Sequence, residues 1–152
     1  MSRRVLVSIV LIVALALLAP SSASALVRVN KGMFGVSLGK TQKQVKRKLG
    51  RPNDVERNRR LREIDWFYDR RQLMVSFKAR TRRVVSLVTS NPRERTASGV
   101  GVGSTEQEVV AGVPGATCST RENRRFCAVF GATAATFFNL EAGRVETVVI
   151  LR

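Results

Sequence analysis

The sequence predicts an α+β protein built from two tandem repeats, each a helix followed by an antiparallel three-stranded sheet, packed side by side. The first observation is a stretch starting at Gly35 whose Gly, Thr and Val spacing recurs from Gly99, 64 positions later. The second is that segments of alternating apolar and polar residues follow each copy, as half-buried strands do. A unit that occurs twice in this way indicates a duplicated supersecondary element.

The first 25 residues have the composition of a secretory signal peptide. Arg3 and Arg4 precede an apolar run over residues 5–19, and Ala23-Ser24-Ala25 offers the small residues that a signal peptidase recognises. The run is shorter than the roughly 20 residues of a spanning helix, which favours cleavage over retention as an anchor. We therefore expect a secreted, extracytoplasmic protein with no transmembrane segment after cleavage.

Short helices are predicted directly after Thr41 and after Thr105. Gln44 and Glu108 stand three residues beyond these threonines, which is the spacing of a capping box. A Gly and a Pro close each helix after about two turns. Helices this short are not stable alone, so each must lay its apolar side on a sheet.

Three strands are predicted to follow each helix. In the first repeat, residues 26–97, they cover 64–68, 73–78 and 84–89; in the second, residues 98–152, they cover 125–130, 133–140 and 144–151. The connections between them are short enough for antiparallel hairpins. The polar link between the repeats is also short, so the repeats are expected to touch.

The stretch from Gly35 to Pro52 reads Gly-x-x-Leu-Gly-x-Thr-x-x-x-Val-x-x-x-Leu-Gly-x-Pro. It resembles the opening of the small lipoprotein of the outer-membrane barrel assembly machine, and tandem forms resemble the β-lactamase-inhibitor-protein fold. The resemblance implies helices packed on an antiparallel sheet over most of the mature chain. The chain differs from the lipoprotein in having no lipidated cysteine, and it shows no loop that matches an enzyme-blocking element.

The two cysteines, Cys118 and Cys127, both lie beyond the signal peptide and are nine positions apart. Export, an even count and short spacing favour a disulfide that closes a small loop. Two buried, reduced thiols are the alternative. A redox-active pair is not expected because there is no C-x-x-C motif.

The chemistry of an enzyme is missing from the sequence. There is no histidine, which removes the usual base near neutral pH and the usual metal ligand. Glu63 and Asp65 share a strand face, but the arginines around them favour a salt-bridged surface over an acid–base pair. Gly99-x-Gly101-x-Gly103 lacks the Lys-Thr of a phosphate loop. We expect no catalytic residues, no metal and no cofactor.

Positive charge is concentrated in the first repeat. Residues 26–97 contain 20 Lys and Arg against 6 Asp and Glu, a formal net charge of +14, whereas residues 98–152 contain 5 of each. Such a field attracts anionic partners in a strongly salt-dependent way. Export argues against nucleic acid, so the expected partner is an acidic protein or an anionic polymer of the cell envelope.

The residues predicted to bind this partner surround the only Trp and the only Tyr of the chain. They are Trp66, Tyr68, Arg59, Arg60, Arg62, Arg70 and Arg71. The two aromatic residues are either core beneath the first helix or exposed interface anchors. The leading hypothesis is a secreted, non-enzymatic protein-binding module, inhibitor-like or an envelope-assembly scaffold. The alternative is a structural envelope protein that adheres to anionic lipid or cell-wall polymer, and a solvated arginine-rich surface without a partner also remains open.

Overall fold

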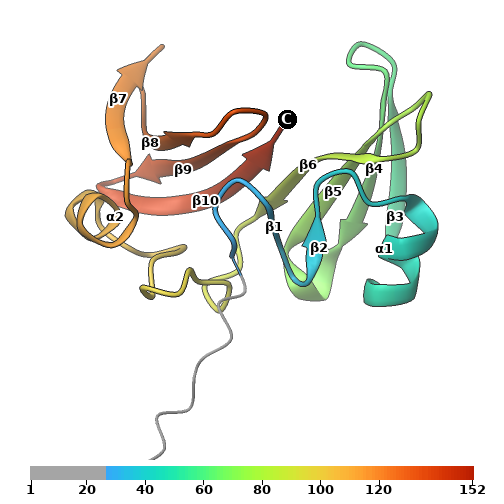
Figure 1. Ribbon diagram of the computed structural model, residues 1–152, viewed down its shortest axis with the longest axis horizontal. Helices are drawn as coiled ribbons and strands as arrows, with labels where there is room; N and C mark the ends of the chain where they lie inside the picture. The colour runs from blue at the N-terminus through green and yellow to red at the C-terminus, as the bar shows by residue number, and fades with distance from the viewer. Residues whose placement is uncertain (1–26) are drawn as a thin grey trace, which may run out of the picture.

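The computed structural model describes residues 27–152, which form a mostly-β fold (Figure 1). In chain order the elements are β1 (Gly32–Met33), β2 (Val36–Ser37), α1 (Gln42–Leu49), β3 (Asp54–Asn58), β4 (Glu63–Tyr68), the 3-10 turn η2 (Asp69–Arg71), β5 (Leu73–Lys78), β6 (Val84–Thr89), α2 (Glu106–Gly112), β7 (Thr117–Arg121), β8 (Arg124–Phe130), β9 (Ala135–Glu141) and β10 (Arg144–Leu151). The predicted signal peptide, residues 1–25, lies outside the described residues.

Eight strands form one continuous antiparallel sheet in the order β3-β4-β5-β6-β10-β9-β8-β7 (Figure 1). The predicted α+β fold of two helix-plus-three-strand repeats is therefore wrong. Four strands follow each helix, and the last strand of the first group, β6, does not end a separate sheet. Instead β6 pairs with β10, with Leu87 opposite Ile150 and Thr89 opposite Val148. Whether residues 26–97 and 98–152 are separate domains stays a prediction.

Sequence patterning missed the short β1–β2 hairpin and, in the eight-stranded sheet, the two edge strands. β3 and β7 each have a strand neighbour on one side only, and their side chains are mostly exposed. A strand with no buried face has no need for alternating apolar residues, so the usual strand pattern is absent. The six strands that were predicted, β4, β5, β6, β8, β9 and β10, are confirmed within a few residues.

One face of the sheet carries the core. Val45 and Leu49 of α1, Val109 of α2 and Met33 and Val36 of the β1–β2 hairpin are all buried in it. They join alternate residues of the inner strands in a single cluster: Tyr68, Leu73, Val75, Phe77, Leu87, Cys127, Phe138, Leu140, Val148 and Ile150. Figure 1 shows the hairpin between the two helices on this face.

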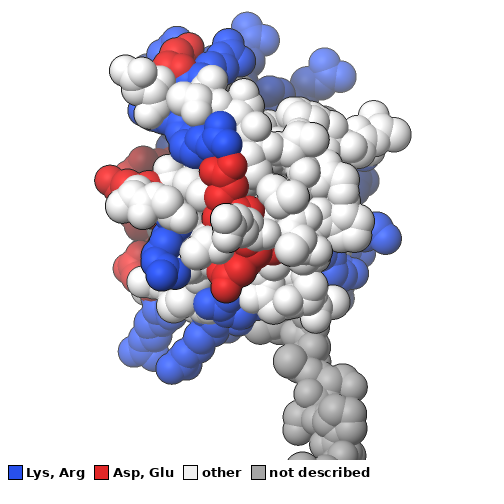
Figure 2. All heavy atoms as spheres, turned by 90° about the vertical axis from the view of Figure 1, so that its left-hand side faces the viewer, with Lys and Arg blue, Asp and Glu red and all other residues white. Residues whose placement is uncertain are grey.

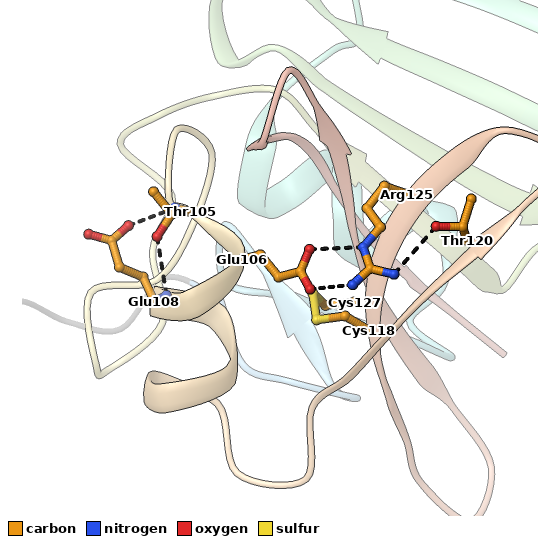
Figure 3. The surroundings of a disulfide bond; sticks show 7 residues. All are labelled: Thr105, Glu106, Glu108, Cys118, Thr120, Arg125 and Cys127. Carbon is orange, nitrogen blue, oxygen red and sulfur yellow. Dashed lines mark hydrogen bonds and ion pairs between the residues drawn. A yellow bond between two sulfur atoms is a disulfide. The ribbon is translucent and has the colours of Figure 1, made fainter.

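Both predicted capping boxes are present. The Thr41 side chain accepts the N–H of Gln44, whose side chain accepts the N–H of Thr41, and Thr105 and Glu108 exchange the same pair of bonds (Figure 3). Each box satisfies backbone N–H groups that have no partner within the helix. This local sequence signal therefore sets where each helix begins.

The loop before each helix is tied to the last strand of the same group. The Arg83 guanidinium donates to the Gly39 carbonyl at 2.9 Å, and the Arg144 guanidinium donates to the Gly103 carbonyl at 2.9 Å. The two helices are thus held to the sheet through equivalent contacts.

The segment before the first helix connects the two groups of strands. The Asn30 N–H donates to the Thr136 hydroxyl on β9 at 2.7 Å, and the Phe34 N–H donates to a Glu94 carboxylate oxygen at 3.2 Å. Glu94 lies in the connection between β6 and α2 and is only 3% exposed. Burial raises the pKa of its carboxyl above the ordinary value of 4.5, and the Phe34 N–H partly opposes this rise.

The predicted disulfide is confirmed. Cys118 and Cys127 are bonded to each other and lie directly opposite in the β7–β8 pair. The bridge closes the β7–β8 hairpin, which forms the far edge of the sheet from β3.

Replacing both cysteines, as Cys118→Ala with Cys127→Ala, is expected to lower the free energy of unfolding by about 2–3 kcal/mol, because the unfolded chain gains the freedom of a small loop. Chemical denaturation measures the change. The unmodified protein in reductant is the control and should lose a similar amount; a loss below about 1 kcal/mol in both would contradict the estimate from loop closure.

Glu94→Gln is expected to stabilise the protein at pH 7, by about 1 kcal/mol or less, because a neutral amide keeps an acceptor for Phe34 and avoids burying charge. The pKa of Glu94 is raised in the folded state. The stabilisation from the protonated Glu94 carboxyl is therefore fully present below the pKa of glutamate in the unfolded chain. It is lost as the pH rises through the higher pKa that Glu94 has in the folded protein. The gain should vanish near pH 4, and exposed Glu122→Gln should change nothing at either pH.

Candidate anion-binding site

Two neighbouring turns gather arginines at one end of the sheet. The β3–β4 turn and the β5–β6 turn lie together, since the Ala79 N–H donates to the Arg62 carbonyl at 2.9 Å and the Lys78 amine donates to the Leu61 carbonyl at 3.2 Å. We call this region the basic hairpin end. Its members are Arg57, Arg59, Arg60, Arg62, Arg80, Arg82 and Arg83.

A surface cavity of about 350 Å³ opens between these turns. Arg57, Arg59, Arg62 and Arg80 line it, and Glu63 is the one carboxylate among the lining residues. That carboxylate lies 3.9 Å from the Lys78 amine. Four of the eight residues that line this cavity are arginines, although most of its wall is apolar. Guanidinium groups are suited to bind phosphate or carboxylate in a bidentate manner.

Within the described part of the chain, the guanidinium groups around the cavity have no protein partner. Among residues 27–152, no ion pair or side-chain hydrogen bond involves Arg57, Arg59, Arg60, Arg62 or Arg80. The salt-bridged surface expected around Glu63 and Asp65 is therefore small. Glu63 pairs with Lys78, and Asp65 is buried with its Oδ1 atom lacking a hydrogen-bond partner in the described part of the chain. The charge of the arginines is free for a ligand.

Trp66 and Tyr68 do not form an exposed aromatic anchor beside these arginines. Trp66 packs on Phe77 at 4.7 Å between ring centroids, against the core. Tyr68 is 3% exposed, and its hydroxyl donates to the Gly50 carbonyl at 3.2 Å. Burial raises the pKa of Tyr68, and the Arg71 charge partly opposes the rise. Both side chains thus lie on the helix-covered face.

Arg70 and Arg71 lie at the opposite end of β4 from the basic hairpin end. Arg71 donates to the Leu49 carbonyl at 2.9 Å, so it closes the end of α1, and its guanidinium lies 6.0 Å from the Tyr68 ring centroid. The length of β4 separates these two arginines from Arg59, roughly 17 Å at the usual rise of a strand. The structure therefore brings together only part of the predicted binding set: Arg59, Arg60 and Arg62.

Acidic and basic side chains are mixed at the other end of the molecule. Figure 2 shows that the side formed by α2 and β7 carries acidic and basic groups close together beside a broad uncharged area. Arg125 donates to both carboxylate oxygens of Glu106, and Figure 3 shows this pair next to the disulfide. The hydrogen bond from Arg125 lowers the pKa of Glu106. Arg125 is therefore held by a carboxylate, unlike the arginines that line the cavity.

Within residues 27–152, the group of side chains closest to a metal-ligand arrangement is Glu106 with Cys118 and Cys127. The two sulfur atoms are bonded to each other, so they are not thiolate ligands. In the same part of the chain, no helix has the length and apolar character needed to cross a membrane.

Sequence reasoning missed an aromatic cluster on the sheet face opposite the helices. The Phe137 ring centroid lies 5.8 Å from that of Phe126 and 5.7 Å from that of Phe130. Phe130 is 70% exposed. The three residues come from β8 and β9, which carry apolar side chains on both faces. The sequence pattern therefore did not indicate which face of these strands the helices would cover.

Comparison with known proteins gives structural matches only. No family model and no curated protein sequence matches the chain. An extracellular protein with an SCP domain from Bacillus anthracis str. Ames is 11% identical, with a TM-score of 0.57 over 75% of this chain and 43% of that protein. A cysteine-rich secretory protein from Staphylococcus aureus is 16% identical, with a TM-score of 0.52 over 75% of this chain and 44% of that one.

A DUF4309 family protein from Bacillus subtilis is 13% identical, with a TM-score of 0.53 over 86% of this chain and 89% of that protein. This chain thus spans less than half of the two secretory proteins but most of the DUF4309 protein. At such identities the likeness establishes a shared fold. The predicted resemblance to the assembly lipoprotein and to the β-lactamase-inhibitor-protein fold is wrong, because the structures that match are these secretory and DUF4309 proteins. The motif from Gly35 to Pro52 marks a capped helix and does not specify the fold around it.

Arg62 and Arg82 adopt left-handed backbone conformations, with φ of 56° and 55°. This conformation disfavours side chains with a Cβ atom. Arg62→Gly and Arg82→Gly are each expected to raise the free energy of unfolding by roughly 0.5–1 kcal/mol. Arg60→Gly is the matched control: it removes the same charge without a positive φ and should lower stability by a similar amount.

Thermal denaturation of the three variants measures these changes. If all three glycine variants shifted the melting temperature in the same direction, relief of charge repulsion or chain entropy alone would explain them, and the backbone argument would be wrong.

Proposed function

We propose that this protein is a secreted, non-enzymatic binding module that holds an anionic polymer of the cell envelope at its basic hairpin end. The observation that carries the proposal is the set of unpaired guanidinium groups around one cavity: Arg57, Arg59, Arg62 and Arg80. Exposed arginines held close together repel one another, and a bound anion removes that repulsion.

Export is supported by independent features. The N-terminal 25 residues have signal-peptide composition, and the disulfide between Cys118 and Cys127 is typical of proteins in oxidising compartments. Two of the structural neighbours are described as an extracellular protein and a secretory protein. These features favour ligands outside the cytoplasm, such as phosphate- or carboxylate-bearing polymers.

Binding of an acidic protein is the second candidate, because a guanidinium cluster also recognises carboxylates. The position of Trp66 separates the two. Trp66 packs on Phe77 against the core and is not an exposed anchor for a protein partner, which favours a polymer held by charge alone. Binding by Trp66→Ala, measured on the folded fraction, should be unchanged under the proposal.

The double variant Arg59→Gln with Arg62→Gln is expected to weaken binding of fluorescent polyphosphate at least tenfold at low salt and to flatten its salt dependence, because two phosphate contacts are lost. The matched control is Arg121→Gln with Arg124→Gln, which removes the same charge from the β7–β8 turn. It should change binding less than about threefold, since only the long-range field is affected.

Poly-L-glutamate serves as the carboxylate probe in the same fluorescence titration. Equal losses in the two double variants would mean that net charge alone holds the polymer, and the proposed site would be wrong.

A further inference from the structure

The two edges of the sheet differ in a way that the proposed anion site does not explain. β3 carries Asp54, Glu56 and Arg57 within five residues, and such charges are a common protection against strand pairing. β7 reads Thr-Cys-Ser-Thr-Arg, with Arg121 as its single charged residue. It contains no proline, and all its residues except the partly buried Cys118 are exposed. β7 is therefore an unprotected edge.

The register of β7 with β8 indicates which backbone groups point outward. Arg121 and Arg124 flank a two-residue turn, so they form a hydrogen-bonded pair and the pairs alternate from there. Cys118 and Cys127 then form a non-hydrogen-bonded pair, in agreement with their Cα separation of 3.9 Å. It follows that Cys118 and Thr120 direct their N–H and C=O groups away from the sheet. In the described structure these outward N–H and C=O groups make no hydrogen bond with the backbone of another segment.

We propose that this protein forms a two-fold symmetric dimer by antiparallel pairing of β7 with β7 of a second copy, with Ser119 at the axis. In this register Cys118 lies opposite Thr120 of the second copy, and Thr120 lies opposite its Cys118. These two pairs make four backbone hydrogen bonds with the outward groups. Ser119 faces its own copy in the central non-hydrogen-bonded pair, and Thr117 lies opposite Arg121, so no like charges are opposed.

The charge distribution favours dimerisation by pairing of β7 and disfavours dimerisation by pairing of β3. Residues 98–152 contain 5 positive and 5 negative residues, so two such halves approach without net repulsion. Pairing through β3 about its centre would oppose Glu56 to itself and bring together two halves of net charge +14. With strands about 4.8 Å apart, β7 pairing leaves the two basic halves at opposite ends of a continuous sheet, well beyond a Debye length.

The interface is small, because β7 has five residues. Apolar groups nearby add to it: α2, which contacts β7, exposes Val110 at 52%, and Phe130 ends the neighbouring β8. Figure 2 shows the broad uncharged area on this side of the molecule. Interfaces of this size are weak, so we expect a micromolar dimer. Raising the salt concentration should change it little, because the halves that meet carry no net charge and the basic halves lie beyond a Debye length from each other.

Sedimentation velocity on the purified protein, from about 5 to 500 µM, tests the proposal in the range of weak interfaces. The expected result is a reversible monomer–dimer equilibrium. Ser119→Lys and Ser119→Glu should each weaken the dimer at least tenfold, because each variant opposes like charges at the axis. An equimolar mixture of the two should recover dimer, because the lysine of one variant then faces the glutamate of the other.

Val55→Lys on β3 is the matched control, since it adds the same charge to the other edge and should leave the dimer unchanged. Circular dichroism confirms that each variant is folded. Monomer at every concentration, dimers that the Ser119 variants leave intact, or a mixture that fails to recover dimer would each overturn the proposal. Species that grow beyond a dimer would also overturn it, since they indicate open-ended pairing of β7 with β3. None of these outcomes involves an anion, so the result is independent of the polyphosphate experiment.

Discussion

The pairing of β6 with β10 is the constraint on which the rest of this structure depends. It joins two four-stranded groups into one sheet, with Leu87, Ile150, Thr89 and Val148 on the shared inner face. Without this pairing, two β-branched segments that carry no charge, residues 84–89 and 147–151, would present open edges to solvent, which proteins avoid. Because these strands occupy the middle of the sheet, β3 and β7 form its edges. The positions of the basic hairpin end and of the β7 edge follow from that strand order.

The joined sheet places a strongly basic group of strands at one end and a group without net charge at the other. The arginines of the β3–β4 and β5–β6 turns project from one group of strands, where they meet few carboxylates. In the other group, Arg125 pairs with Glu106 and Arg121 pairs with Glu122. Such separation keeps the cationic cluster free of competing acids. It also leaves the far end able to contact uncharged surfaces without strong repulsion.

Local signals in the sequence predicted local structure well. The Thr41 and Thr105 capping boxes, six of the strands and the disulfide follow from interactions between residues close in the chain. The fold class failed because it depends on β6 meeting β10, about 60 residues apart, and both strands are apolar on two faces. An apolar run of that kind fits the centre of any sheet and does not specify its neighbour. The part of the site within one hairpin, Arg59 to Arg62, could be predicted, whereas its separation from Arg70 and Arg71 depends on the path of β4.

Trp66 illustrates why composition misleads about a site. A single Trp beside many arginines resembles an interface anchor, yet the register of β4 directs residues 64, 66 and 68 to one face, and α1 covers that face. The same register sends Phe67 to the opposite face, where the aromatic cluster of β8 and β9 also lies. Once one residue of a strand is known to face the core, the alternation of side chains assigns a face to all the others. In β4 that residue is Tyr68, whose hydroxyl donates to the Gly50 carbonyl at the end of α1. At this end of the molecule the accessible functional groups therefore lie in the β3–β4 and β5–β6 turns, where strand alternation does not bury side chains. Most of these groups are arginine guanidiniums.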